Sequence, residues 1–167
     1  MALLGFPNPV NEIAARTVAA GVVLLTGFMF ILATALDTVW LWLTIPLAYG
    51  FLARVLTGPR LSPLGQVATR VIAPRVGREK LVAGPPKRFA QAMGLAMSTA
   101  ALVLHAAGWD RAALVFVGMV FVAATLESAF ALCLGCKIFA VLMRLGVIPE
   151  DTCRECNDIS LRYSTAS

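Results

Sequence analysis

The chain has 167 residues, of which 59% are hydrophobic and 14% are charged, and its mean hydropathy is +0.83. A soluble domain carries about 45–50% apolar and about 25% charged residues, so this composition argues against a soluble enzyme, a disordered chain or a secreted disulfide scaffold. The net charge is +5, but no basic patch with interleaved aromatic residues occurs, which argues against nucleic-acid binding. A small integral membrane protein of one helical domain, residues 1–167, is the class that fits.

Four apolar runs are long enough to cross a bilayer as helices, because a hydrocarbon core about 30 Å thick needs about 20 helical residues. We place these spans at about residues 17–36, 39–56, 89–108 and 112–134. The links between the first and second spans and between the third and fourth are very short, which makes the joined helices antiparallel neighbours. The sequence therefore predicts an all-α integral membrane bundle of four transmembrane helices in two hairpins. Beyond the last span we expect a cytosolic helical extension and a cysteine-containing tail over residues 137–167.

The segment that joins the two hairpins has a helical pattern of its own at about residues 62–76. Its apolar residues recur at helical spacing, with basic residues around them: Leu64, Val67, Ala68, Val71 and Ile72, and Arg70 and Arg75. This pattern is typical of a short helix in the membrane interface, where each basic residue gains roughly 1 kcal/mol from anionic lipid. We expect a lipid-facing anchor at the inner face; a docking surface for a protein partner is the alternative.

The placement of Lys and Arg predicts the orientation, because cytosolic loops are enriched in both. If the joining segment is cytosolic, both termini are cytosolic as well. All 14 basic residues except Arg111 then lie inside or at the inner boundary. The opposite orientation would place nearly all of them outside.

Two charged residues fall within the apolar spans at matching depth. Arg54 and Glu127 each lie about 17 residues from an outer turn, which corresponds to about 25 Å at the helical rise and places them near the inner edge of the hydrocarbon. A lone carboxylate there is costly, so we expect Glu127 to contact Arg54, Arg16 or Gln91. The pair is either a clamp between helices or a proton or ligand site. The single histidine, His105, lies near the outer surface and is expected to bond to a neighbouring helix or to water.

Four cysteines form the pattern C-x2-C-x16-C-x2-C, and they are Cys133, Cys136, Cys153 and Cys156. Both pairs fall on the cytosolic side, where permanent disulfides are rare. The spacing is within the range of four-thiolate zinc sites. In the first interpretation one zinc ion binds all four thiolates and staples the tail to the helical extension, as part of a membrane scaffold or adaptor.

Other interpretations of the cysteines stay open. The pairs could form a membrane thiol–disulfide or sulfur-transfer relay with a cytosolic thioredoxin-like or sulfurtransferase partner, in which neighbouring basic residues favour thiolates: Lys137, Arg144 and Arg154. An iron–sulfur cluster and unlinked thiols are further alternatives. No catalytic constellation other than the cysteine pairs occurs, so the sequence leaves open whether the protein is an enzyme. Transport of a small solute would need a homo-oligomer, for which small residues permit close helix contacts: Ala19, Ala20, Gly21 and Gly27.

Two motifs carry a resemblance to a known family. Residues 86–91, Pro-Lys-Arg-Phe-Ala-Gln, precede the third span, and residues 131–136, Ala-Leu-Cys-Leu-Gly-Cys, end the fourth. With these and the later cysteine pair, the chain resembles a bacterial membrane-protein family defined as a domain of unknown function. The resemblance covers most of the chain and implies an all-helical, multi-pass protein of the bacterial cytoplasmic membrane. More loosely, the chain resembles small four-helix thiol oxidoreductases linked to quinones, although those place their cysteine pairs on the outer side.

Overall fold

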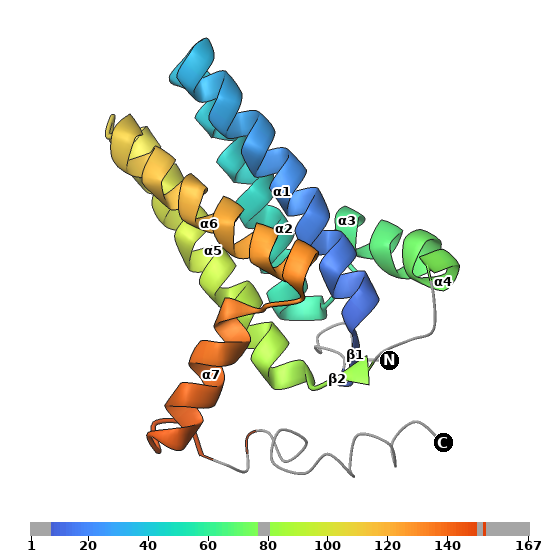
Figure 1. Cartoon of the computed structure of the whole chain (residues 1–167). Coiled ribbons are helices and arrows are strands. Elements are labelled where there is room, and N and C mark those ends of the chain that lie inside the picture. Colours follow the sequence, from blue (N-terminus) through green and yellow to red (C-terminus); the bar gives the residue numbers. More distant parts are fainter. Residues whose placement is uncertain (1–7, 77–80, 150–151, 153–167) are drawn as a thin grey trace.

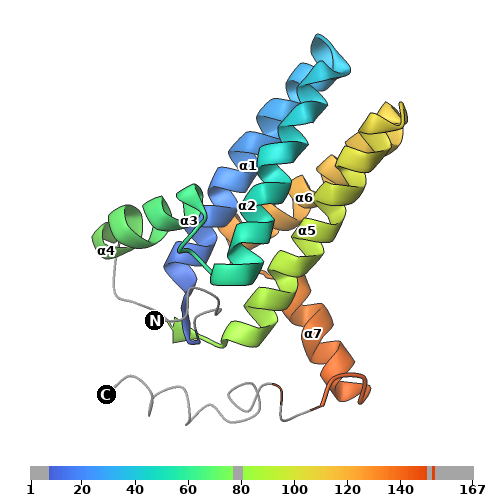
Figure 2. The ribbon, with the colours of Figure 1, turned by 180° about the vertical axis from the view of Figure 1, so that it is seen from behind.

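A computed structural model describes residues 8–76, 81–149 and 152 of the chain. Within these residues, four helical segments are long and apolar enough to cross a membrane, and they pair as two hairpins (Figures 1 and 2). The four segments are α1, Glu12–Ala35; a 3₁₀ helix η1, Thr38–Leu43, continued by α2, Thr44–Thr57; α5, Gly84–Ala106; and α6, Asp110–Phe130. This arrangement confirms the predicted all-α bundle with four candidate membrane spans.

Both hairpin tips point the same way, whereas β1, β2 and α7 lie at the other end of the bundle (Figure 1). At the tip of the first hairpin, the Asp37 side chain accepts a hydrogen bond from the Val39 amide at 2.8 Å. At the other tip, Gly108 adopts a φ of 81°, and His105 Nδ1 lies 2.6 Å from Asp110 Oδ1. The expected polar partner of His105 is therefore the first residue of the next helix.

The two hairpins share one core. Helix α1 packs mainly against α6, α2 packs against α5, and α5 and α6 pack against each other. The core side chains come from all four spans, and they include Val22, Met29, Leu41, Phe51, Ala101, Ala113 and Val117. The bundle is therefore held together across the hairpins as much as within them.

The segment that joins the two hairpins along the chain contains a short helical stretch, as predicted. This stretch consists of α3, Pro63–Val67, a π-helical turn η2, Ala68–Ile72, and α4, Ala73–Val76. Its buried side packs on α1 through Ala68 and Ala73. A Cβ on Gly21 of α1 would lie 2.6 Å from Leu64 Cδ1, so a side chain at Gly21 would displace the Leu64 side chain from its place against α1. The two-residue strands β1, Val10–Asn11, and β2, Leu81–Val82, pair antiparallel.

The fourth span differs from the prediction. Helix α6 ends at Phe130, and Ala131 takes a left-handed conformation with a φ of 55°. The chain turns there and begins a separate helix, α7, Leu134–Arg144. Helix α7 does not continue α6, because its apolar side packs against the start of α5, with Phe139 5.6 Å from Phe89 between ring centroids. Cys153 and Cys156 lie outside the described residues.

Candidate functional site

The Cys133–Cys136 pair sits at the start of α7. Cys133 is the N-cap residue of this helix, and its Sγ accepts a hydrogen bond from the Cys136 amide at 3.3 Å. The two side chains are free thiols that face each other, with Cys136 donating to Cys133. Cys133 is buried and Cys136 is half-buried. A helix N-terminus carries unsatisfied N–H groups and a partial positive charge, and both favour a thiolate at Cys133.

The two thiols are therefore not equivalent. The hydrogen bond from Cys136 lowers the pKa of Cys133 below its usual value, and the charge of nearby Lys87 acts in the same direction against the opposing effects of burial and Glu127. The same hydrogen bond, together with burial, raises the pKa of Cys136. The geometry favours Cys133 as the thiolate of the pair and Cys136 as the protonated thiol.

The glycine of the Cys-Leu-Gly-Cys motif has a packing role. A Cβ on Gly135 would lie 2.5 Å from Ala90 Cα, so a glycine is needed where α7 crosses α5. This close approach brings the cysteine pair to the turn of α5 that carries Lys87 and Gln91.

Glu127 is paired, but its partner is not one of those expected. Glu127 Oε1 lies 2.6 Å from Lys87 Nζ, with 14% and 9% of the two side chains exposed. Arg54 instead donates from Nε to Gln91 Oε1 at 2.7 Å. Arg16 donates from Nη2 to the Ser128 carbonyl at 2.9 Å. The prediction that Glu127 is paired was correct, and the prediction of its partner was wrong.

Lys87 was missed because the third span was taken to begin at Phe89. Helix α5 begins at Gly84, with prolines in its first turn, where a missing N–H costs no hydrogen bond. Lys87 therefore lies on the helix, one turn before Gln91. Lys87 and Gln91 are four residues apart and therefore lie on one face of a helix. This spacing was the sequence signal that could have identified Lys87 as a residue of the bundle.

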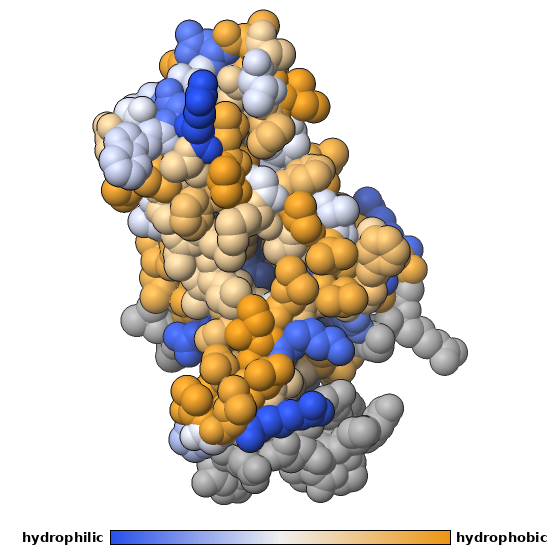
Figure 3. Space-filling view, turned by 60° about the vertical axis from the view of Figure 1, so that its left-hand side comes forward, coloured by the Kyte–Doolittle hydropathy of each residue, from blue (hydrophilic) through white to orange (hydrophobic). Residues whose placement is uncertain are grey.

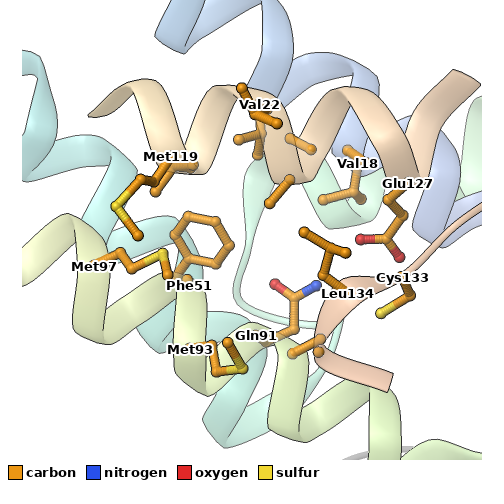
Figure 4. Close-up of a pocket in the computed structure, with 18 of the residues that line it drawn as sticks. Val18, Val22, Phe51, Gln91, Met93, Met97, Met119, Glu127, Cys133 and Leu134 are labelled. Atoms are coloured by element: carbon orange, nitrogen blue, oxygen red, sulfur yellow. The ribbon is translucent and has the colours of Figure 1, made fainter. Parts of the chain in front are cut away.

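A cavity of about 270 Å³ lies between the hairpins beside the start of α7. Its walls are mainly apolar and include Phe51, Met93, Met97 and Met119, whereas Gln91, Glu127 and Cys133 lie together at one end (Figure 4). The surface of this part of the molecule is largely hydrophobic and is hollowed near its middle (Figure 3). Cys133 thus borders a mainly apolar cavity at its polar end.

The described residues provide two of the four sulfurs of the predicted zinc site. Within residues 8–76, 81–149 and 152, no group of three or more His, Cys, Asp or Glu side chains could hold a metal ion. The other two sulfurs of the predicted site, those of Cys153 and Cys156, lie outside the described residues. Whether the two pairs converge stays a prediction.

A comparison with protein families matches residues 10–144 to a domain of unknown function, DUF4395. The chain belongs to this family. The matched region contains all four spans, Cys133 and Cys136, and ends at Arg144, before the second cysteine pair. No curated protein and no solved structure matches the chain. The family and the fold together describe a polytopic membrane protein.

Proposed function

We propose that this DUF4395 protein is a membrane thiol–disulfide relay whose Cys133–Cys136 pair exchanges with a cytosolic thioredoxin-like protein. The observation that carries the proposal is the difference between the two thiols: one is a buried helix cap with a lowered pKa, and the other is half-exposed and protonated. This division of roles is the one that disulfide exchange requires, because the attacked sulfur must be accessible and the leaving sulfur must be a stable thiolate.

The exchange begins with the pair as a disulfide. A thiolate of the partner attacks the more accessible sulfur, Cys136 Sγ, and the disulfide bond breaks with Cys133 leaving as a thiolate. The partner is then joined to Cys136 through a mixed disulfide. A second partner thiolate attacks the partner's own sulfur in that bond, releasing Cys136, which takes up a proton. The partner is oxidised from a dithiol to a disulfide, and the Cys133–Cys136 disulfide is reduced to the thiol pair found in the structure.

Trapping experiments test this assignment on a background in which Cys153 and Cys156 are both replaced by serine. The Cys133→Ser variant should form a mixed disulfide through Cys136 with a thioredoxin-family protein that lacks its second cysteine and carries thionitrobenzoate in a disulfide on the first, because Cys136 attacks that disulfide and thionitrobenzoate leaves. The matched Cys136→Ser variant, which keeps only the buried Cys133, should form far less of it on non-reducing gels. Equal trapping by the two variants, or none by either, would contradict the relay.

A zinc-stapled scaffold is the second candidate, and the four-cysteine spacing favours it. It requires all four sulfurs about 2.3 Å from one zinc ion. The purified wild-type protein would then contain about one zinc per chain, and its thiols would resist alkylation until a chelator is added. Metal content and free-thiol count, measured on one sample, separate this candidate from the relay.

The proposal places the protein in a bacterial cytoplasmic membrane with both termini inside. Every described basic residue except Arg111 lies in the half of a span away from the hairpin tips, in the segment that joins the hairpins along the chain, or on α7. The stretch between the hairpins presents exposed apolar and basic side chains together: Val67, Val71 and Val76, with Arg70 and Arg75. This combination supports contact with anionic lipid at the inner face.

A further inference from the structure

A second cavity, of about 200 Å³, lies at the end of the bundle away from the hairpin tips. It is lined by β1 and the start of α1, the end of α2 and the turn after it, α3 with the start of η2, and the first turns of α5. Two cations, Arg54 and Lys87, line it, together with three uncharged polar side chains, Asn11, Thr69 and Gln91. No aspartate or glutamate is among the described residues of its lining.

Arg54 is held rigidly in the wall of this cavity. Only 6% of the residue is exposed. Its Nε donates to Gln91 Oε1, its Nη1 donates to Ser62 Oγ at 3.3 Å, and the guanidinium carbon lies 4.6 Å from the centre of the Phe51 ring. The guanidinium is therefore oriented before any ligand arrives.

One nitrogen of this guanidinium is left without a partner. Arg54 Nη2 is buried and makes no hydrogen bond to any part of the chain that the structure describes. A buried charged donor without a partner is costly. Lys87 has its counter-charge in Glu127, whereas no ion pair within 4 Å joins Arg54 to a carboxylate of the described residues. The cavity thus contains one positive charge with no carboxylate within 4 Å, although Glu127, which lines the first cavity together with Arg54, attracts it at longer range.

The two amide side chains of the cavity have hydrogen-bond donors left, whereas the Thr69 hydroxyl already donates to the Gly65 carbonyl at 2.7 Å. Asn11 Oδ1 already accepts from the Ile13 amide, and Gln91 Oε1 accepts from Arg54. The amide nitrogens of both side chains remain, and these are donors only. A cavity that has a fixed guanidinium and free N–H donors but no carboxylate is suited to an anion.

We infer that this cavity binds a small oxyanion, such as sulfate, thiosulfate, phosphate or a carboxylate. Arg54 Nη2 donates to it, and the Gln91 amide and the Lys87 ammonium contribute further hydrogen bonds. The anion is either free in the cytosol or the headgroup of an anionic lipid, since both present the same oxygens. The inference goes beyond the thiol relay and does not depend on it, because it rests on Arg54 rather than on the cysteines.

The test uses the full chain in nanodiscs of zwitterionic phosphatidylcholine. Thermal unfolding is followed while sulfate, thiosulfate or phosphate replaces chloride at constant ionic strength. Sulfate also stabilises proteins through its exclusion from their surfaces. The measured quantity is therefore the rise in unfolding temperature of the wild type minus the rise for Ala15→Leu, a variant designed to fill the cavity. We expect a saturable excess response to at least one of these oxyanions.

Arg54→Lys keeps the positive charge but removes the Nη2 donor, and it should weaken the apparent affinity at least tenfold. Arg70→Lys, a matched change of an exposed arginine outside the cavity, should bind like the wild type. In a second arm, part of the phosphatidylcholine is replaced by phosphatidylglycerol. If the headgroup is the occupant, this lipid stabilises the wild type but not Arg54→Lys, and added sulfate has no further effect.

The inference is overturned if the wild type responds to neither the free oxyanions nor phosphatidylglycerol. It is also overturned if the wild type, Arg54→Lys and Ala15→Leu respond equally. Failure of the cysteine trapping experiment leaves it untouched, because none of these measurements involves a thiol.

Discussion

The Lys87–Glu127 pair gives the sharpest prediction about the stability of the bundle. The two groups lie 2.6 Å apart with 9% and 14% of their side chains exposed. Removing one partner of a buried pair leaves the other charge buried and unpaired, which costs about 3–5 kcal/mol. Because both side chains keep some exposure, we expect the lower end, about 3 kcal/mol, for either Lys87→Met or Glu127→Leu.

The double variant should be much more stable than the sum of the single changes predicts. Replacing both members of a buried pair by apolar residues is often neutral, so the coupling energy should be about 3 kcal/mol or more. Glu127→Gln should cost less than Glu127→Leu, because the amide oxygen can still accept a hydrogen bond from Lys87 Nζ.

The assay is reversible unfolding of the purified protein in mixed micelles with increasing dodecyl sulfate, followed by circular dichroism. Lys137→Met is the matched control, because Lys137 is exposed at the same end of the bundle, and it should change the free energy of unfolding by no more than about 0.5 kcal/mol. If the effects of the two single changes simply add in the double variant, the two charges do not stabilise each other and the reasoning is wrong.

Three further predictions concern the backbone and the orientation. Gly135→Ala should cost about 1–3 kcal/mol in the free energy of unfolding through overpacking against Ala90, while Gly118→Ala should be tolerated because its Cβ would meet nothing closer than 3.9 Å. Ala131→Gly should raise the free energy of unfolding by about 0.5–1 kcal/mol. A left-handed conformation costs a residue with a Cβ about 1–2 kcal/mol, and the larger backbone entropy that glycine loses on folding offsets part of this gain. If the variant is not more stable, Ala131 does not adopt the left-handed conformation. On a cysteine-free background, Arg111→Cys should react with an impermeant thiol reagent from outside intact cells, and the exposed Arg75→Cys only after the cells are opened; labelling of Arg75→Cys in intact cells would reverse the orientation.

The four spans could be predicted from the sequence because each is a long apolar run, and hydropathy reports such runs directly. The ends of the helices could not. Asn11 caps α1, so a polar first turn that hydropathy leaves out still forms helix. The prolines before Lys87 read as a boundary, yet they are compatible with the first turn of a helix. That one error moved Lys87 out of the bundle and led to the wrong partner for Glu127.

The break after Phe130 had no sequence signal, because the left-handed residue there is alanine rather than glycine or asparagine. Its consequence for the cysteines is large. In a continuous helix the Cys136 amide would bond to the carbonyl four residues earlier, at Leu132, and no N–H would be left for a sulfur. Because of the break, Cys133 is instead the N-cap residue of a new helix, and the Cys136 amide donates to its Sγ at 3.3 Å. The difference between the two thiols therefore follows from a single turn of backbone that tertiary packing imposes, with Gly135 against Ala90 and Phe139 against Phe89 holding α7 across α5.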